Sequence, residues 1–133
     1  MDELYRDAMR EQVLGLKEEL EDILAELVKN PSPSRMVYRS AERSLQLLTE
    51  ACIGIAKRTL KAEGKQVPSD ARQAFSKLKS LGLDSTGADW NRIIGMRNAL
   101  VHDYLNIEPD RVLGVIRLKH YEVLLDFAAE RLA

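Results

Sequence analysis

Apolar residues recur along the first 29 residues at spacings of four and three, which is the period of an amphipathic helix. They form a heptad-like seam of Met9, Val13, Leu16, Leu20, Ile23 and Leu27. This pattern predicts a long helix over residues 2–29 that packs on another helix, from the same chain or from a second protomer. The charged positions between the seam residues are most simply a solvated face.

Two prolines separate this helix from the next one. Pro31 and Pro33 end the first helix because proline has no amide hydrogen and the residue before it avoids helical geometry. Ser34 is then expected to cap a second helix that runs to about Glu63. Its apolar face consists of Val37, Ala41, Leu45, Leu48, Cys52, Ile55 and Ala56.

Three further helices are expected after residue 63. The first covers residues 69–80, with Ser69 as its cap and Gly82 at its end. A second helix is expected over residues 88–106, and a last one opens at Pro109. Apolar positions of the last helix face inward, namely Val112, Ile116, Val123, Leu124 and Phe127. Because no stretch alternates as a strand does, the sequence predicts an all-α bundle of four to five helices.

Composition agrees with one globular domain over residues 1–133. The chain is 45% hydrophobic and 31% charged, and it has no apolar run of membrane-spanning length and no signal peptide. We therefore expect a cytoplasmic protein that does not enter a membrane. The single Cys52 lies among apolar residues and is expected to be a buried, inert thiol.

Charge is distributed unevenly along the chain. Residues 1–29 hold nine acidic and four basic side chains, which is −5, so the remainder carries +4 of the overall −1. That balance excludes indiscriminate coating of nucleic acid but allows a local RNA contact. Arg35, Arg39 and Arg43 form a row on one helix face, which is either a solvated surface or a track for the RNA backbone.

Arg97 interrupts an apolar stripe of the helix expected over residues 88–106. Helical spacing places it among Trp90, Ile93, Ile94, Leu100, Val101, Tyr104 and Leu105. A guanidinium cannot lose its proton, and a buried unpaired charge costs several kcal/mol, so folding alone would favour an aliphatic residue here. Arg97 is therefore a candidate functional residue.

His102 lies roughly 140° around the same helix, on an edge with Gly95 and Asn98. A partner helix packed across Gly95 would gather Arg97, Asn98 and His102 into one cleft. Arginine suits phosphate and histidine exchanges protons near neutrality, so together they suggest phosphodiester chemistry. The structural alternative is an arginine capped by carbonyls and a histidine near a helix end.

The sequence contains no motif typical of another catalytic chemistry. It has no Gly-rich phosphate loop, no CxxC or HxxxH metal pair and no nucleophile elbow, so neither a metal nor a cofactor is expected. The acidic residues fall on solvated helix faces rather than converging on one pocket. His120 lies near the inward stripe of the last helix, so a packed and hydrogen-bonded histidine is expected there.

The run RNALVHDY at residues 97–104 resembles the R-x4-H-x-Y motif of HepT toxins in the HEPN superfamily. The resemblance continues in the same order over roughly residues 35–127. It includes residues 35–60, the helix start at Pro68 and Ser69, the turn at 81–83, and residues 94–97 and 104–107.

This resemblance implies a homodimer that pairs through the motif helix and has its cleft between protomers. It implies a metal-independent endoribonuclease, the toxin partner of an MntA-type nucleotidyltransferase antitoxin. The 2′-hydroxyl of RNA would attack the neighbouring phosphate. His102 would act as general acid or base, Arg97 would stabilise the phosphate charge, and Asn98 would orient the phosphate or His102.

The resemblance also makes Tyr104 the residue to which the antitoxin transfers AMP. A phosphodiester there adds negative charge beside Arg97. The alternative function is a non-catalytic module that binds a nucleotide or RNA as the partner of a nucleotidyltransferase.

Overall fold

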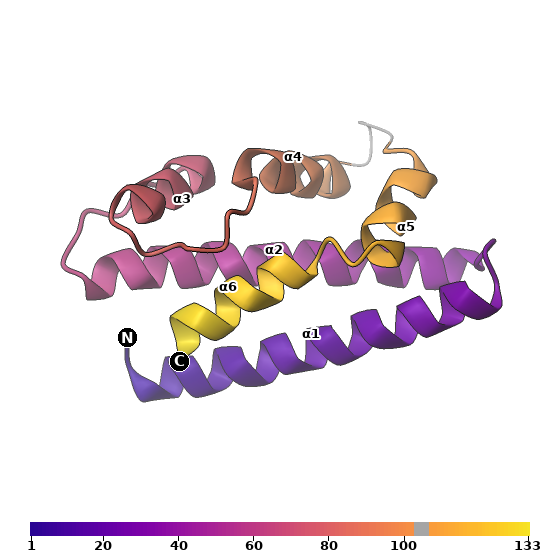
Figure 1. Ribbon diagram of the computed structural model, residues 1–133, viewed down its shortest axis with the longest axis horizontal. Helices are drawn as coiled ribbons and strands as arrows, with labels where there is room; N and C mark the ends of the chain where they lie inside the picture. The colour runs from indigo at the N-terminus through magenta and orange to yellow at the C-terminus, as the bar shows by residue number, and fades with distance from the viewer. Residues whose placement is uncertain (103–106) are drawn as a thin grey trace.

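The computed structural model describes residues 1–102 and 107–133. These residues form six helices and no strand: α1 (Glu3–Lys29), α2 (Arg35–Ala62), α3 (Ala71–Ser80), α4 (Trp90–Val101), α5 (Pro109–Arg117) and α6 (Glu122–Leu132). The all-helical prediction is confirmed (Figure 1). None of these helices is long and apolar enough to cross a membrane.

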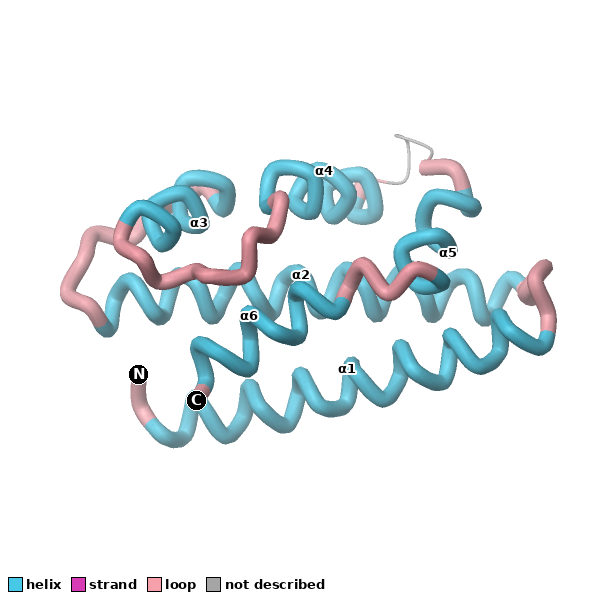
Figure 2. Tube along the Cα trace, in the orientation of Figure 1, coloured by secondary structure: helices cyan, strands magenta, loops and turns pink. Residues whose placement is uncertain are grey.

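Helix α2 is the centre of the bundle, since it packs against each of the other five helices. Figure 2 shows α1 and α2 as two long helices, with α3 and α4 following α2 on the side away from α1. The apolar face predicted for α2 is buried except at Val37, which is partly buried and packs against the core. Burial raises the pKa of the Cys52 thiol well above its ordinary value, as expected for an inert side chain.

The seam of α1 packs within its own chain. Leu16, Leu20, Ile23 and Leu27 are buried, and α1 packs against α2, α5 and α6. The described chain therefore supplies the partner helices for this seam.

The helix caps explain where the predicted boundaries are right and where one is wrong. Ser34 accepts a hydrogen bond from the Val37 amide at 3.2 Å and begins α2 as predicted. Asp70, not Ser69, caps α3 by accepting from the Gln73 amide at 3.0 Å, because a carboxylate is an equally good cap one residue later. Gly82, at φ 72°, ends α3 as expected.

The last predicted helix is two helices, α5 and α6. Lys119 has φ 54° and its amide donates to the Ile116 carbonyl at 3.0 Å, while the His120 amide donates to the Val115 carbonyl at 2.9 Å. This pair of hydrogen bonds is a Schellman motif, which usually has glycine at the left-handed position. Because a lysine occupies that position, no glycine or proline indicates the break in the sequence.

Helix α4 is anchored at its start by an aromatic cluster. The rings of Phe75 and Trp90 stack with centroids 3.7 Å apart, and Phe127 meets both rings edge-on. The Trp90 indole donates to Asp84 at 2.7 Å. Burial alone would raise the pKa of Asp84, but hydrogen bonds from Thr86 and Trp90 outweigh it and hold that pKa below its ordinary value.

Candidate functional site

Arg97 lies in the wall of a cavity of about 530 Å³. Helices α4 and α5 both pack on α2, and among the described residues they make no close backbone contact with each other. The cavity lies between them, with Leu45 and Thr49 of α2 and Leu124 of α6 also in its wall. The fold therefore places Arg97 beside a space that a ligand could enter.

The cavity combines apolar walls with excess positive charge. Its apolar lining includes Ile93, Met96, Leu100, Ile107, Val115 and Leu118. Its charged lining consists of Arg92, Arg97 and Arg111 against one acidic residue, Asp110. A site with this balance favours an anionic ligand that also has an apolar part.

The guanidinium of Arg97 has a nitrogen to which no described residue hydrogen-bonds. Its Nε atom is buried and has no hydrogen-bond partner among the described residues. Buried polar nitrogens are nearly always paired in folded proteins, so an orphaned one needs an explanation, such as a ligand. The Nε atoms of Arg6 and Arg131 are also orphaned, but their guanidinium groups reach the Ala133 carbonyl and the Glu130 carboxylate respectively.

His102 lies at the end of α4, not within a continuing helix. It is the C-cap residue, it is exposed, and its amide donates to the Asn98 carbonyl at 3.1 Å. The helix predicted to run unbroken past His102 instead ends at Val101, and the rest of its predicted length, residues 103–106, lies outside the described residues. Val101 is 43% exposed and so does not lie on a buried stripe. Tyr104, the predicted AMP acceptor, lies outside the described residues.

A single chain brings only part of the predicted constellation together. Arg97 lines the cavity, whereas neither Asn98 nor His102 is part of its lining. The nearest side chain over Gly95 is Arg72 of α3, whose Nη2 lies 3.6 Å from the point that a Cβ at residue 95 would occupy. Arg72 also donates to the Asn91 carbonyl at 3.3 Å. The neighbour across Gly95 in this chain is thus a side chain of α3, and pairing with a second protomer stays a prediction.

Arg92, Arg111 and His120 line the cavity although the sequence analysis did not predict them there, and His120 is the one for which it predicted a different environment. The sequence predicts a packed histidine, but His120 is exposed and lines the same cavity as Arg97. The break at Lys119 causes this difference, because it ends α5 before His120 can join the inward stripe of a continuous helix. Only a signal for that break could have revealed His120, and the sequence has none.

The arginine row predicted on α2 is a solvated surface in the described chain. Arg35, Arg39 and Arg43 are all exposed, and Arg39 forms an ion pair with Glu42 at 3.1 Å. Exposed pairs of this kind contribute little to stability. Contact of this row with RNA remains a prediction.

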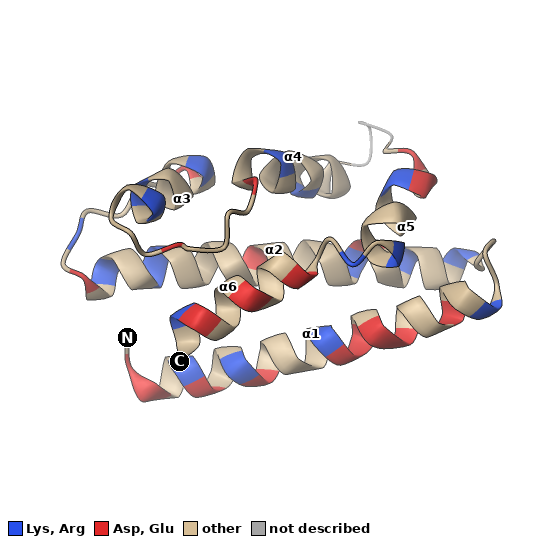
Figure 3. Cartoon of the chain, viewed as in Figure 1, with Lys and Arg blue, Asp and Glu red and all other residues tan. Residues whose placement is uncertain are grey.

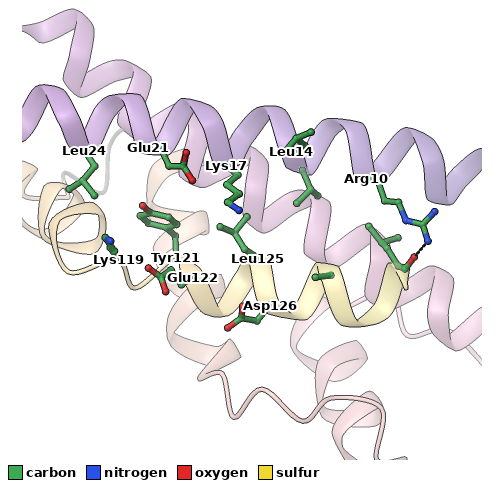
Figure 4. A pocket seen from close by; sticks show the side chains of 13 residues that line it. Arg10, Leu14, Lys17, Glu21, Leu24, Lys119, Tyr121, Glu122, Leu125 and Asp126 are labelled. Carbon is green, nitrogen blue, oxygen red and sulfur yellow. Dashed lines mark hydrogen bonds between the residues drawn. The ribbon is translucent and has the colours of Figure 1, made fainter.

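A second cavity, of about 700 Å³, lies between α1 and α6 (Figure 4). Three cations, Arg10, Lys17 and Lys119, face three carboxylates, Glu21, Glu122 and Asp126. Arg10 is held by the Leu132 carbonyl. Within the described ranges, no group of His, Cys, Asp or Glu side chains could hold a metal ion.

Charge separates the two sides of the bundle. Figure 3 shows acidic residues along α1 and α6, whereas the charged residues of α3 and α4 are all Lys or Arg. The all-helical fold of the described residues is that of a HEPN-type bundle. The chain belongs to the HepT-like family, described as "Ribonuclease HepT-like", whose sequence profile matches residues 3–131.

Two known proteins are similar to this chain. The mRNA nuclease HepT of Shewanella oneidensis is 31% identical over 87 residues, which are 62% of this chain and 65% of that relative. The chain thus matches just under two thirds of that relative's length. A chain in a crystal structure of a toxin-antitoxin with AMP-PNP has the same fold, with a TM-score of 0.75 and 22% identity over 98% of this chain and 99% of that chain.

Proposed function

We propose that this protein is a metal-independent endoribonuclease and the toxin of a toxin-antitoxin pair. The observation that carries the proposal is the buried Nε of Arg97, which lines a positive cavity on the helix that ends at Val101 and has no hydrogen-bond partner among the described residues. Membership of the HepT-like family and the similarity to an mRNA nuclease support it.

The reaction needs only an acid-base group and a group that stabilises phosphate charge. The 2′-oxygen of RNA attacks the adjacent phosphorus, the bond from phosphorus to the 5′-oxygen breaks, and a cyclic phosphate and a 5′-hydroxyl result. His102 takes the proton of the 2′-hydroxyl or gives one to the leaving oxygen. Arg97 stabilises the charge that develops on the phosphate oxygens, and Asn98 orients the phosphate or His102.

We further propose that the working site lies between two protomers. In one chain, His102 and Asn98 do not line the cavity that holds Arg97. A second copy whose α4 packs beside the first would bring one protomer's His102 close to the other's Arg97. A homodimer therefore accounts for how separated groups act on one phosphate.

The test compares three purified variants with the unaltered protein on RNA in the presence of EDTA. Arg97→Ala and His102→Ala should each reduce the cleavage rate by roughly 10²-fold to 10³-fold, because each removes a transition-state contact or a proton-transfer group. Arg6→Ala removes a matched arginine on α1 and should cleave normally. Circular dichroism and the mass in solution must be unchanged for all three.

Two results would contradict this proposal. Normal cleavage by a folded Arg97→Ala or His102→Ala variant would remove that residue from the site. Intact RNA with every protein, including the unaltered one, would favour a non-catalytic module that binds RNA or a nucleotide.

We also propose that an MntA-type nucleotidyltransferase is the antitoxin and silences the protein by transferring AMP to Tyr104. The toxin-antitoxin fold neighbour that was crystallised with AMP-PNP supports a nucleotide in such a pair. Incubation with the partner, ATP and magnesium should add about 329 Da per AMP unit, as mass spectrometry would show. Tyr104→Phe should stay unmodified, and neutralisation without a mass change would point to simple complex formation.

A further inference from the structure

Glycines on two helices line the cavity that holds Arg97. Gly95 lies on α4 and Gly114 on α5. Glycine is unfavourable in a helix interior, and it often marks a place where another group approaches the backbone closely. A Cβ built at Gly114 would meet nothing within 4 Å. The missing side chain at Gly114 therefore keeps the cavity open, and packing among the described residues does not require a glycine there.

The size and lining of the cavity suit one nucleotide. A volume of about 530 Å³ lies in the range of small-molecule sites, which are mostly apolar with a few placed polar groups. Met96, Leu100 and Val115 offer apolar surface to a flat base. Arg97 and Arg111 supply donors and positive charge for a phosphate, and the His120 imidazole offers a further donor.

We propose that this cavity binds the nucleoside next to the phosphate that is cut. The base lies between α4 and α5, and its phosphate contacts Arg97 and Arg111, with Arg97 Nε donating one hydrogen bond. His120 borders the phosphate as a binding residue. The inference deepens the proposed ribonuclease function and rests on it, because it identifies where that enzyme holds its substrate.

Gly114→Leu is the direct test, since the new side chain fills the cavity from a position with open space around it. Gly15→Leu is the matched control: Gly15 is also helical, a Cβ there also meets nothing within 4 Å, and it lines neither cavity. Both changes replace glycine by a better helix former, so both variants should fold.

Calorimetry would measure the binding of the four nucleoside 3′-monophosphates, the four 5′-monophosphates and inorganic phosphate. At least one nucleotide should bind tenfold or more tightly than phosphate, and the 3′ and 5′ series would show which side of the cut the cavity holds. Gly114→Leu should weaken that binding at least tenfold, and Gly15→Leu should change it less than twofold.

The same proteins are assayed for RNA cleavage, which separates this inference from the proposed function. If Gly114→Leu binds nucleotides and cleaves RNA as well as the parent, the inference fails and the ribonuclease stands. Equal affinity for phosphate and every nucleotide also overturns it, leaving a simple anion site. If no protein cleaves RNA but Gly114→Leu alone loses nucleotide binding, the nucleotide site stands and the ribonuclease proposal fails.

Discussion

The two cavities described above differ more in charge pairing than in volume. The larger one, between α1 and α6, holds three cations and three carboxylates, and its Arg10 is held by a backbone carbonyl. The smaller one, between α4 and α5, holds three arginines and one carboxylate, and Arg97 Nε has no partner among the described residues. Unbalanced charge, rather than volume, therefore indicates which cavity is built to receive a ligand.

Tyr121 is the wall that the two cavities share. It lines both cavities and is only 3% exposed. Figure 4 shows its ring between α1 and the start of α6. Changes at this residue therefore test whether the cavities are independent.

The largest expected effect is that of Tyr121→Ala, which should join the two cavities. Removing a buried aromatic ring leaves a void and typically costs about 3 to 5 kcal/mol, so the free energy of unfolding should fall by about that much. Urea denaturation followed by circular dichroism would measure it. Leu4→Ala, at a side chain that is 85% exposed, should change stability by less than about 0.5 kcal/mol. An equally small loss for Tyr121→Ala would mean that the ring is not a structural wall.

A smaller effect is expected when one cation is removed from each cavity. Arg111→Ala should lower the RNA cleavage rate about tenfold, since it removes positive charge beside the phosphate. It should also make the slope of log affinity against log salt concentration shallower by about one unit, which corresponds to one lost phosphate contact. Lys17→Ala, in the charge-balanced cavity, should leave both measurements unchanged. Cleavage rates and RNA affinities measured over a range of salt concentrations give the loss of activity and the change in slope. Equal losses in the two variants would show that the cavities do not differ in function.

The smallest effect concerns alkaline pH. Burial, followed by the negative charges of Glu122 and Glu21, raises the pKa of Tyr121 above 10. The folded state therefore favours the neutral phenol. The stability that depends on a neutral Tyr121 is fully present below pH 10 and is lost as the pH rises through the folded-state pKa. Tyr121→Phe should lose less stability than the parent between about pH 9 and 12. Identical profiles would show that Tyr121 does not titrate differently in the folded state.

The parts of the fold that the sequence predicts are those with a local chemical signal. Pro31 and Pro33 separate α1 from α2, and Ser34 caps α2. Gly82 ends α3 in a left-handed conformation that glycine adopts freely. The division of the last helix at Lys119 has no such signal, because a lysine there adopts the left-handed conformation that residues other than glycine disfavour.

The residues of the candidate site also differ in whether a local sequence signal predicts them. A charged residue on an apolar stripe is enough to predict a special role for Arg97. Its Nε, which has no hydrogen-bond partner among the described residues, agrees with that expectation. His120 could not be predicted, because its exposure depends on the break at Lys119. The role of Tyr104 and the pairing of two protomers stay predictions, since Tyr104 lies outside the described residues and one chain is described.

The turn at Lys119 determines which of the two cavities each side chain from residue 118 to residue 121 faces. Leu118 and His120 line the smaller cavity, Lys119 lines the larger one, and Tyr121 lines both. Successive side chains from Leu118 to His120 thus point alternately into the smaller and the larger cavity. A one-residue insertion or deletion here would exchange the lysine and histidine between the cavities while leaving the composition of the chain almost unchanged. Among related sequences, the length of this connection should therefore vary less than the identity of its residues.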